Sequence, residues 1–171
     1  MRSTLTLAGA LLAVAACGPK ATTPAAPANE GGTTATPARG PGTSGFETLS
    51  WGDTADQILA DFPTGETDGE AVTIVTTYQG HPVVVTAYLE GGGLRSVQAA
   101  VGDGYASMQA CGDDFASLRA AMDGVLGRSQ EDNLAAYWTT ATAAVQASCD
   151  PVDDDGRAEM SISFAPPEPE E

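Results

Sequence analysis

The chain has 171 residues, with 23 acidic and seven basic side chains and a formal net charge of −16. This excess of acid argues against nucleic-acid binding and against a polybasic contact with anionic lipid, because Lys and Arg make both kinds of contact. A single histidine and three cysteines exclude most metal and catalytic sites that depend on those residue types. Aromatic residues make up only 6% of the chain, so we expect one domain with a modest core.

The first 16 residues have the features of an export signal. Arg2 supplies a positive start, and the apolar run over residues 5–13 that follows is too short to span a bilayer. Small residues then directly precede a cysteine, in the order Val14-Ala15-Ala16-Cys17. Charge, apolar run, small residues and cysteine therefore follow one another within twenty positions.

This order resembles the lipobox of bacterial lipoprotein precursors. The resemblance implies that residues 1–16 are removed, that the sulfur of Cys17 carries a diacylglyceryl group, and that the new N-terminus is acylated, for example by palmitate. Gly18 resembles the sorting pattern for the outer membrane, which implies a lipid-anchored envelope protein facing the periplasm. The lipid at Cys17 is then the only covalent group expected, and no other cofactor. The alternative is an ordinary secretory signal with an incidental cysteine.

Residues 17–44 differ from the rest of the chain in composition, since they are mainly Pro, Ala, Thr and Gly. Such a segment cannot bury enough apolar surface to offset its ordering entropy, and its prolines favour an extended backbone. We expect a disordered tether that spaces the domain from the membrane. Residues 166–171 form a short acidic, proline-rich tail.

The globular domain is expected over residues 45–165, and it opens with a short helix followed by three strands. Asp53 is a plausible N-cap, and Pro63 ends the helix after one apolar stripe. Residues 64–70 are expected to form a loop. Alternating apolar residues and short glycine-containing turns then predict three antiparallel strands, over residues 72–78, 83–89 and 94–101.

The second half repeats this order. Asp113 or Asp114 is the expected helix cap, and Gly127 the expected stop. The buried stripe of this helix would consist of Phe115, Leu118, Met122, Val125 and Leu126. Three further strands are expected around Tyr137 and Trp138, over residues 143–149 and over residues 159–164.

These elements predict an α+β fold in which two helix-plus-three-strand halves form one antiparallel sheet. Both helices are expected on one face of the sheet, because an antiparallel sheet can leave its other face in water. The second face would then be free for a partner.

A looser resemblance concerns the opening of the domain, where Phe46 is followed by Trp51-Gly52 before a short helix. Many small secreted bacterial domains run in this order, and Tyr88, Leu94 and Trp138 are the later landmarks. Such domains are similar to outer-membrane assembly lipoproteins of the BamE type and to the helix-and-sheet repeats of β-lactamase inhibitor proteins. Both resemblances imply protein binding rather than catalysis.

Two cysteines remain beside Cys17, and an exported domain lies in a compartment that permits disulfides. We therefore expect Cys111 and Cys149 to form one bridge. Two buried thiols or a redox role are the alternatives, although the chain has no Cys-x-x-Cys motif. His81, the single histidine, precedes a proline in a predicted turn and is expected to be a surface residue.

Acidic residues crowd the segment that ends at Gly156. Asp150, Asp153 and Asp155 are candidate Ca²⁺ ligands, with Asp154 between them, because a flexible loop of carboxylates suits that ion. The spacing is not that of an EF-hand, and a solvated hairpin tip is the preferred interpretation. Two tryptophans could line a ligand groove, but core anchoring is preferred for both, Trp51 and Trp138.

The functional hypothesis is a membrane-anchored, non-catalytic cell-envelope lipoprotein that binds a protein partner or supports envelope assembly. The alternative is a periplasmic module that binds a small ligand or a cation, and a hydrolase ranks third. An exposed sheet face carrying aromatic residues would favour a protein partner. A large apolar concavity with converging polar groups would favour a small ligand.

Overall fold

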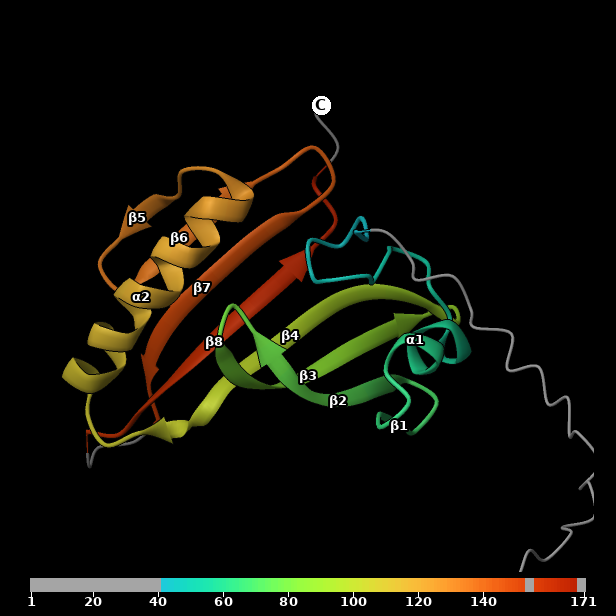
Figure 1. The fold of residues 1–171 in the computed structure, drawn as a ribbon, viewed down its shortest axis with the longest axis horizontal. Coiled ribbons are helices and arrows are strands. Elements are labelled where there is room, and N and C mark those ends of the chain that lie inside the picture. The colour runs from blue at the N-terminus through green and yellow to red at the C-terminus, as the bar shows by residue number, and fades with distance from the viewer. Residues whose placement is uncertain (1–40, 153–155, 169–171) are drawn as a thin grey trace, which may run out of the picture. The chain divides into compact units, whose positions relative to one another are not determined.

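The structure is a computed structural model that describes residues 41–152 and 156–168. Its described part forms one eight-stranded antiparallel sheet in the order β1-β2-β3-β4-β8-β7-β6-β5, with two helices (Figure 1). The helices are α1 (Ala55–Asp61) and α2 (Met108–Leu126). The strands are β1 (Glu66–Thr67), β2 (Ala71–Tyr78), β3 (His81–Glu90), β4 (Gly93–Tyr105), β5 (Gln130–Asp132), β6 (Ala135–Thr139), β7 (Ala144–Pro151) and β8 (Ala158–Ala165).

The predicted fold class is wrong. In place of an α+β fold built from two helix-plus-three-strand halves, the described chain is mostly sheet, and each helix is followed by four strands. The missed strands, β1 and β5, are short and polar, so neither shows an alternating apolar pattern. The carboxylate of Asp68 accepts the N–H groups of Glu70 and Ala71, which closes the β1–β2 turn. Glu131 on β5 forms an ion pair with Arg119 on α2.

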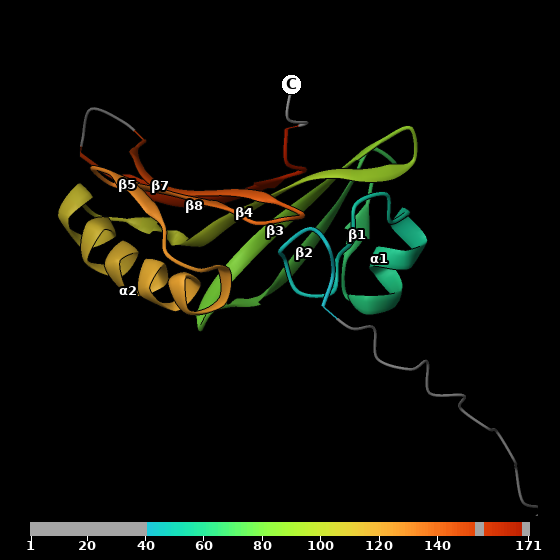
Figure 2. The ribbon, with the colours of Figure 1, turned by 90° about the horizontal axis from the view of Figure 1, so that it is seen from above.

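The sheet buries one face only. One cross-strand row of this covered face consists of Ile74, Val85, Ala99, Ile162, Ala147 and Ala136, paired in that order from β2 to β6. All six are buried, and the residues before and after them along each strand are more exposed. Figure 2 shows α1 and α2 on the same side of the sheet, near its two ends. Burial of this apolar face is the main favourable contribution to folding.

Both helices begin at residues other than the predicted caps. At α1 the cap is Thr54, whose hydroxyl accepts the N–H of Gln57, while the Gln57 side chain accepts the N–H of Thr54 at 2.8 Å. Asp53 is instead buried, and its carboxylate accepts the N–H of Ser50. Helix α2 begins earlier than predicted, because Ser107 caps it by accepting the N–H of Ala110.

The segment before α1 fills the part of the covered face between the two helices (Figure 2). Phe46 and Leu49 are fully buried in it. The ring of Phe46 stacks on Tyr78 of β2 at 4.9 Å between centroids and meets Phe164 of β8 edge-on at 5.6 Å. This aromatic cluster joins the start of the domain to strands from both halves of the sheet.

The last turns of α2 are attached to the sheet by a partly buried hydrogen bond. The indole N–H of Trp138, which is 2% exposed, donates to the carboxylate of Asp123 at 2.8 Å. The backbone N–H of Ser129 donates to the same oxygen at 2.9 Å. Desolvation opposes ionisation of Asp123, but these two donors hold the pKa of the carboxyl below its ordinary value.

We expect the substitution Asp123→Ala to lower the free energy of unfolding by about 1–3 kcal/mol, because it leaves the buried indole N–H without an acceptor. Asp123→Asn is the matched control, since its amide oxygen can still accept that hydrogen bond, and it should cost less. Urea denaturation followed by tryptophan fluorescence measures both changes. Equal losses for the two variants would show that the carboxylate charge, rather than acceptance of the indole N–H, sets the effect.

Candidate functional site

The uncovered face of the sheet, here called the open face, carries mainly uncharged side chains. Cross-strand pairing places two complete rows on it between β2 and β6. The first row is Thr73, Thr86, Gln98, Ser163, Gln146 and Tyr137, and the second is Val75, Val84, Ala100, Ser161, Ser148 and Ala135. Six strands spaced by about 4.8 Å make this surface roughly 24 Å wide.

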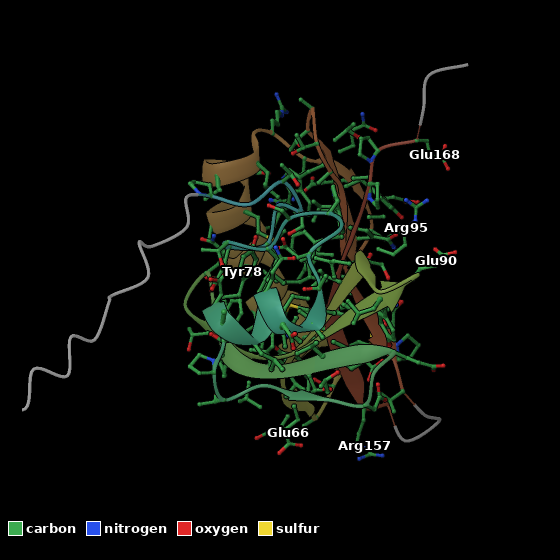
Figure 3. The ribbon with its side chains drawn as sticks, turned by 90° about the vertical axis from the view of Figure 1, so that its right-hand side faces the viewer. Glu66, Tyr78, Glu90, Arg95, Arg157 and Glu168 are labelled. Atoms are coloured by element: carbon green, nitrogen blue, oxygen red, sulfur yellow. A yellow bond between two sulfur atoms is a disulfide. The ribbon has the colours of Figure 1, made fainter. Side chains whose placement is uncertain are left out.

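The central rows contain no charged side chain, although the chain carries 23 acids. The rows become acidic only where they reach the outermost strands, at Glu66 on β1 and Asp132 on β5. At one end of the face, Asp150 lies opposite Glu159, and both are exposed. Figure 3 shows Glu66 and Glu90 projecting outward at the margins of the sheet. The open face is therefore an uncharged centre with a mainly acidic surround, in which Arg95 pairs with Glu90 and Arg157 precedes β8 near Glu159.

Larger exposed side chains stand at intervals on the open face. Tyr88 and Tyr137 are each 41% exposed, and they lie on β3 and β6. Val75 and Val84 form an exposed apolar cross-strand pair on β2 and β3. Between these side chains, a shallow depression of about 410 Å³ lies over the middle strands, lined by residues that include Gln98. The face thus combines tyrosine and aliphatic contacts with small Ser and Ala side chains. Its tyrosines and its lack of charge are features of interface cores, whereas Ser and Ala are less common there.

A groove of about 590 Å³ that no sequence motif predicted lies beside the last turn of α2. Its lining includes Val125 and Leu126 from that turn, Tyr78 from β2, and Glu47 from the segment before α1. Desolvation raises the pKa of the Glu47 carboxyl, and it raises the pKa of the Tyr78 hydroxyl to about 12. The Tyr78 hydroxyl donates to the backbone carbonyl of Gly45 at 3.4 Å. Only long-range packing brings these residues together, since they lie far apart in the chain.

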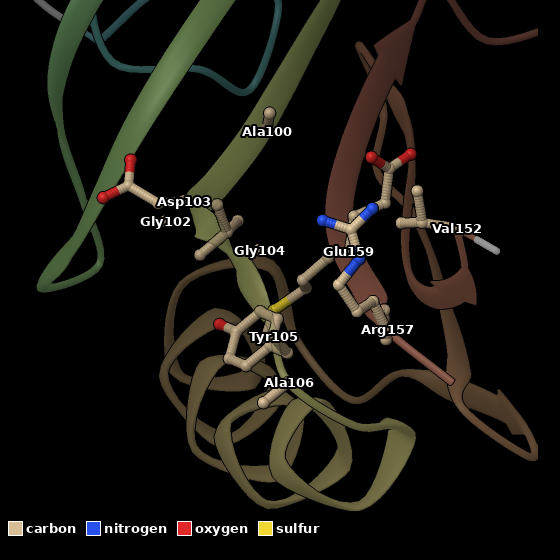
Figure 4. A pocket seen from close by; sticks show the side chains of 12 residues that line it. Ala100, Gly102, Asp103, Gly104, Tyr105, Ala106, Val152, Arg157 and Glu159 are labelled. Atoms are coloured by element: carbon tan, nitrogen blue, oxygen red, sulfur yellow. The ribbon is translucent and has the colours of Figure 1, made fainter. Parts of the chain in front are cut away.

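A smaller pocket of about 400 Å³ lies where the pairing of β4 with β8 shifts between Val101 and Tyr105 (Figure 4). Asp103 and Tyr105 come from β4. Arg157 directly precedes β8, and Glu159 lies at the start of that strand. The Tyr105 hydroxyl donates to Asp114 at 3.0 Å. Desolvation and that carboxylate raise the pKa of Tyr105 to about 12, so the phenol keeps its proton at neutral pH.

The structure brings together the two cysteines predicted to form a bridge. Cys111 and Cys149 are joined by a disulfide with an S–S distance of 2.03 Å. Cys111 lies within the first turn of α2 rather than just before the helix, and Cys149 lies near the end of β7. Both residues are buried, so the bridge connects the helix to the sheet at the end opposite Trp138 and Asp123.

The candidate Ca²⁺ ligands fall mostly outside the described residues, as Asp153, Asp154 and Asp155 all do. Asp150 is described, and its carboxylate accepts the hydroxyl of Ser148 at 2.7 Å. Within residues 41–152 and 156–168, no group of three or more His, Cys, Asp or Glu side chains is arranged to hold a metal ion. Cys17, the predicted lipid attachment, also lies outside the described residues.

The structure also describes the single histidine and the two tryptophans. His81 is the first residue of β3 and is half-buried, rather than lying in the turn itself. Trp138 belongs to the core, as preferred, while Trp51 is half-buried and packs against the core with its indole N–H donating to the carbonyl of Thr142 at 2.7 Å. Neither tryptophan is among the residues lining the three cavities described above.

Comparison with protein families, with curated proteins and with solved structures finds no match to this chain. No helix in the described part of the chain is both long and apolar enough to cross a bilayer. Evidence for the function therefore comes from the surfaces described above and from the sequence features of the first 44 residues.

Replacing both bridge cysteines, as Cys111→Ala with Cys149→Ala, should lower the free energy of unfolding by about 4 kcal/mol. The bridge spans 38 residues, and the chain-entropy relation assigns that stabilisation to a loop of this length. Urea denaturation of the double variant and the parent chain measures the change. A loss below about 1 kcal/mol would indicate that residual structure already restricts the unfolded chain almost as much as the bridge does.

Proposed function

We propose that this protein is a membrane-anchored, non-catalytic cell-envelope lipoprotein that binds a protein partner through the open face of its sheet. The observation that carries this proposal is the uncharged centre of that face, in a domain whose other surfaces are acidic. Interface cores are depleted in charged residues and enriched in tyrosine, which matches the two rows and the exposed Tyr88 and Tyr137.

The charge pattern also indicates the chemistry of the partner. Acidic residues surround the neutral centre, at Glu66, Asp132, Asp150 and Glu159. A partner with a neutral, hydrogen-bonding patch framed by Lys and Arg would complement this arrangement. Such complementarity mainly accelerates encounter, and added salt weakens it. We therefore expect a basic envelope protein rather than an acidic one.

The groove beside α2 is the feature that the small-ligand alternative would require. Two of its polar groups are already committed, because the Tyr78 hydroxyl donates to Gly45 and the Thr140 hydroxyl donates to the carbonyl of Ala143. The open face, by contrast, spans the six central strands and presents side-chain hydroxyls and amides toward solvent. For this reason the open face is preferred as the binding site.

The anchor in this proposal is the lipid expected at Cys17, followed by a tether. The predicted bound of the tether at residue 44 is wrong, because the N–H groups of Gly42 and Ser44 donate to the carbonyls of Glu47 and Leu49 and Ser44 is buried. Residues 17–40 lie outside the described residues. Disulfide formation between Cys111 and Cys149 supports export, because such bridges persist in oxidising compartments. We place the protein at the outer membrane, facing the periplasm, on the basis of Gly18 after the lipidated cysteine.

The substitution Cys17→Ser should move the full chain from the membrane fraction to the soluble fraction, because it removes the atom that carries the lipid. Fractionation of cells that produce the protein measures the shift, and incorporation of an alkyne-labelled fatty acid reports the lipid directly. The variant with Cys111→Ala and Cys149→Ala is the control, and it should stay labelled and membrane-bound. Retention of Cys17→Ser in the membrane with no label in the parent chain would contradict lipid anchoring.

A photo-crosslinking amino acid placed at Tyr137 should capture one discrete envelope protein in intact cells. Introducing two charges into the face, as Gln98→Glu with Gln146→Glu, should reduce that adduct at least tenfold, because both would be desolvated on binding. The matched control is Ser117→Glu, which adds a charge to the exposed surface of α2 and should leave the adduct unchanged.

The identity of the captured protein completes the test. An adduct that persists in the charged variant, or that forms equally from a crosslinker at position 117, would contradict binding through the open face. An acidic partner whose capture does not weaken with added salt would contradict the proposed chemistry, even if the site were right.

A further inference from the structure

One edge of the sheet is only half covered. Strand β1 pairs with β2 through Glu66 opposite Thr73 and Thr67 opposite Val72, and no described strand lies beside β2 beyond Thr73. Figure 1 shows β1 at one end of β2, while the rest of β2 forms the margin of the sheet. The stretch of β2 without a neighbouring strand, Ile74–Tyr78, contains no charge and no proline; Val75 in it is 72% exposed, whereas the side chains of Ile74 and Tyr78 are buried. Natural edge strands usually carry charged residues or prolines, which prevent pairing with another chain, and this stretch has neither.

The hairpin geometry shows which backbone groups point outward from this edge. Tyr78 pairs with His81 across the two-residue turn Gln79-Gly80, whose residues both have positive φ. In such a hairpin the pair next to the turn exchanges hydrogen bonds, so Tyr78, Thr76 and Ile74 direct their N–H and C=O groups toward β3. Val75 and Thr77 therefore direct theirs away from the sheet, where a further strand could accept and donate.

We infer that this edge pairs with the same edge of a second copy, antiparallel, about a two-fold axis through Thr76. The uncovered stretch is bounded by Glu66 opposite Thr73 on one side and by the turn at Gln79 on the other, so it is symmetric about Thr76. A two-fold axis there places Val75 opposite Thr77 of the second copy, and Thr77 opposite its Val75. Each of these two pairs exchanges two backbone hydrogen bonds.

The absence of charge along this edge of β2 favours a second copy of the chain as its partner. Neutral residues meet neutral residues across the axis, so pairing brings no like charges directly opposite, despite the net charge of −16 on each chain. The opposite edge of the sheet contrasts with it, because β5 carries Glu131 and Asp132 and would repel its own copy. A two-fold dimer, in which the same patch of both copies forms the contact, is also the commonest kind of homo-oligomer. A five-residue contact is small, so we expect a weak dimer that a covalent trap detects best.

The test is a cysteine placed on the axis. Thr76 and its copy form a non-hydrogen-bonded pair with Cα atoms about 4.5 Å apart, within the range that a disulfide spans. The full chain carrying Thr76→Cys, oxidised mildly in cells that produce it, should yield a disulfide-linked dimer above the level of the unaltered chain. Thr73→Cys is the matched control, since this residue is exposed on the same strand but far from the axis, and it should yield none.

A second change separates backbone pairing from chance collision. Val75→Pro removes one outward N–H donor from each chain and should reduce the Thr76→Cys dimer at least tenfold. Val75→Lys should do the same without altering the backbone, while Val75→Thr should retain the dimer. Absence of the Thr76→Cys dimer, equal yields from Thr73→Cys, no loss with Val75→Pro and Val75→Lys, or linkage to a different protein would each overturn the inference. The Thr76→Cys dimer tests the edge apart from the lipid and the open-face partner, because the side chain of Thr76 lies on the covered side of the strand. Thr73 and Val75 also belong to the open face, so the Gln98→Glu, Gln146→Glu variant, which leaves the edge unchanged, distinguishes loss of the partner from loss of the dimer.

Discussion

The structure depends on the burial of one face of a single sheet by elements that are too small to cover it alone. Helix α1 has seven residues and α2 has 19, and each packs near one end of the eight strands. The segment before α1 closes the space between them, with Phe46 stacked on Tyr78 and edge-on to Phe164. These contacts connect β2 with β8, so the aromatic cluster joins the two halves of the sheet into one core.

This arrangement determines where function can lie. Because both helices and the connecting segment cover the same face, the other face meets solvent with its side chains already ordered by the sheet. Helix α2 is attached near its start by the Cys111–Cys149 bridge and near its end by the bond from Trp138 to Asp123. The covered face is therefore secured from both ends of the longer helix, and the open face can keep a fixed geometry without contributing to the core.

The sequence predicted the features that follow a strong apolar period and missed those that do not. Phe115, Leu118 and Met122 of the predicted buried stripe are buried, whereas Val125 is 64% exposed at the end of the helix. The stripe located α2, but the first turn, over residues 108–111, precedes it, so the predicted start is too late. The polar strands β1 and β5 have no such period and form through turn hydrogen bonds and an ion pair. The Cys111–Cys149 disulfide was predictable from the cysteine count, because only two cysteines remain beside Cys17. The groove beside α2 was not, because Glu47, Tyr78 and Val125 meet only through the fold.

The distribution of charge follows from having one layer of sheet. An exposed sheet with an uncharged face and an uncharged edge is prone to unspecific association, and a net charge of −16 opposes that tendency. Most acids lie on the helices, turns and outer strands, and those on the central strands, such as Asp150 and Glu159, lie near the strand ends, so they repel unselected neighbours without occupying the central rows. A partner must then bring complementary charge to reach the open face, while a second copy must align its neutral edge about Thr76. The same acidity therefore keeps the domain dispersed and restricts which contacts are favourable.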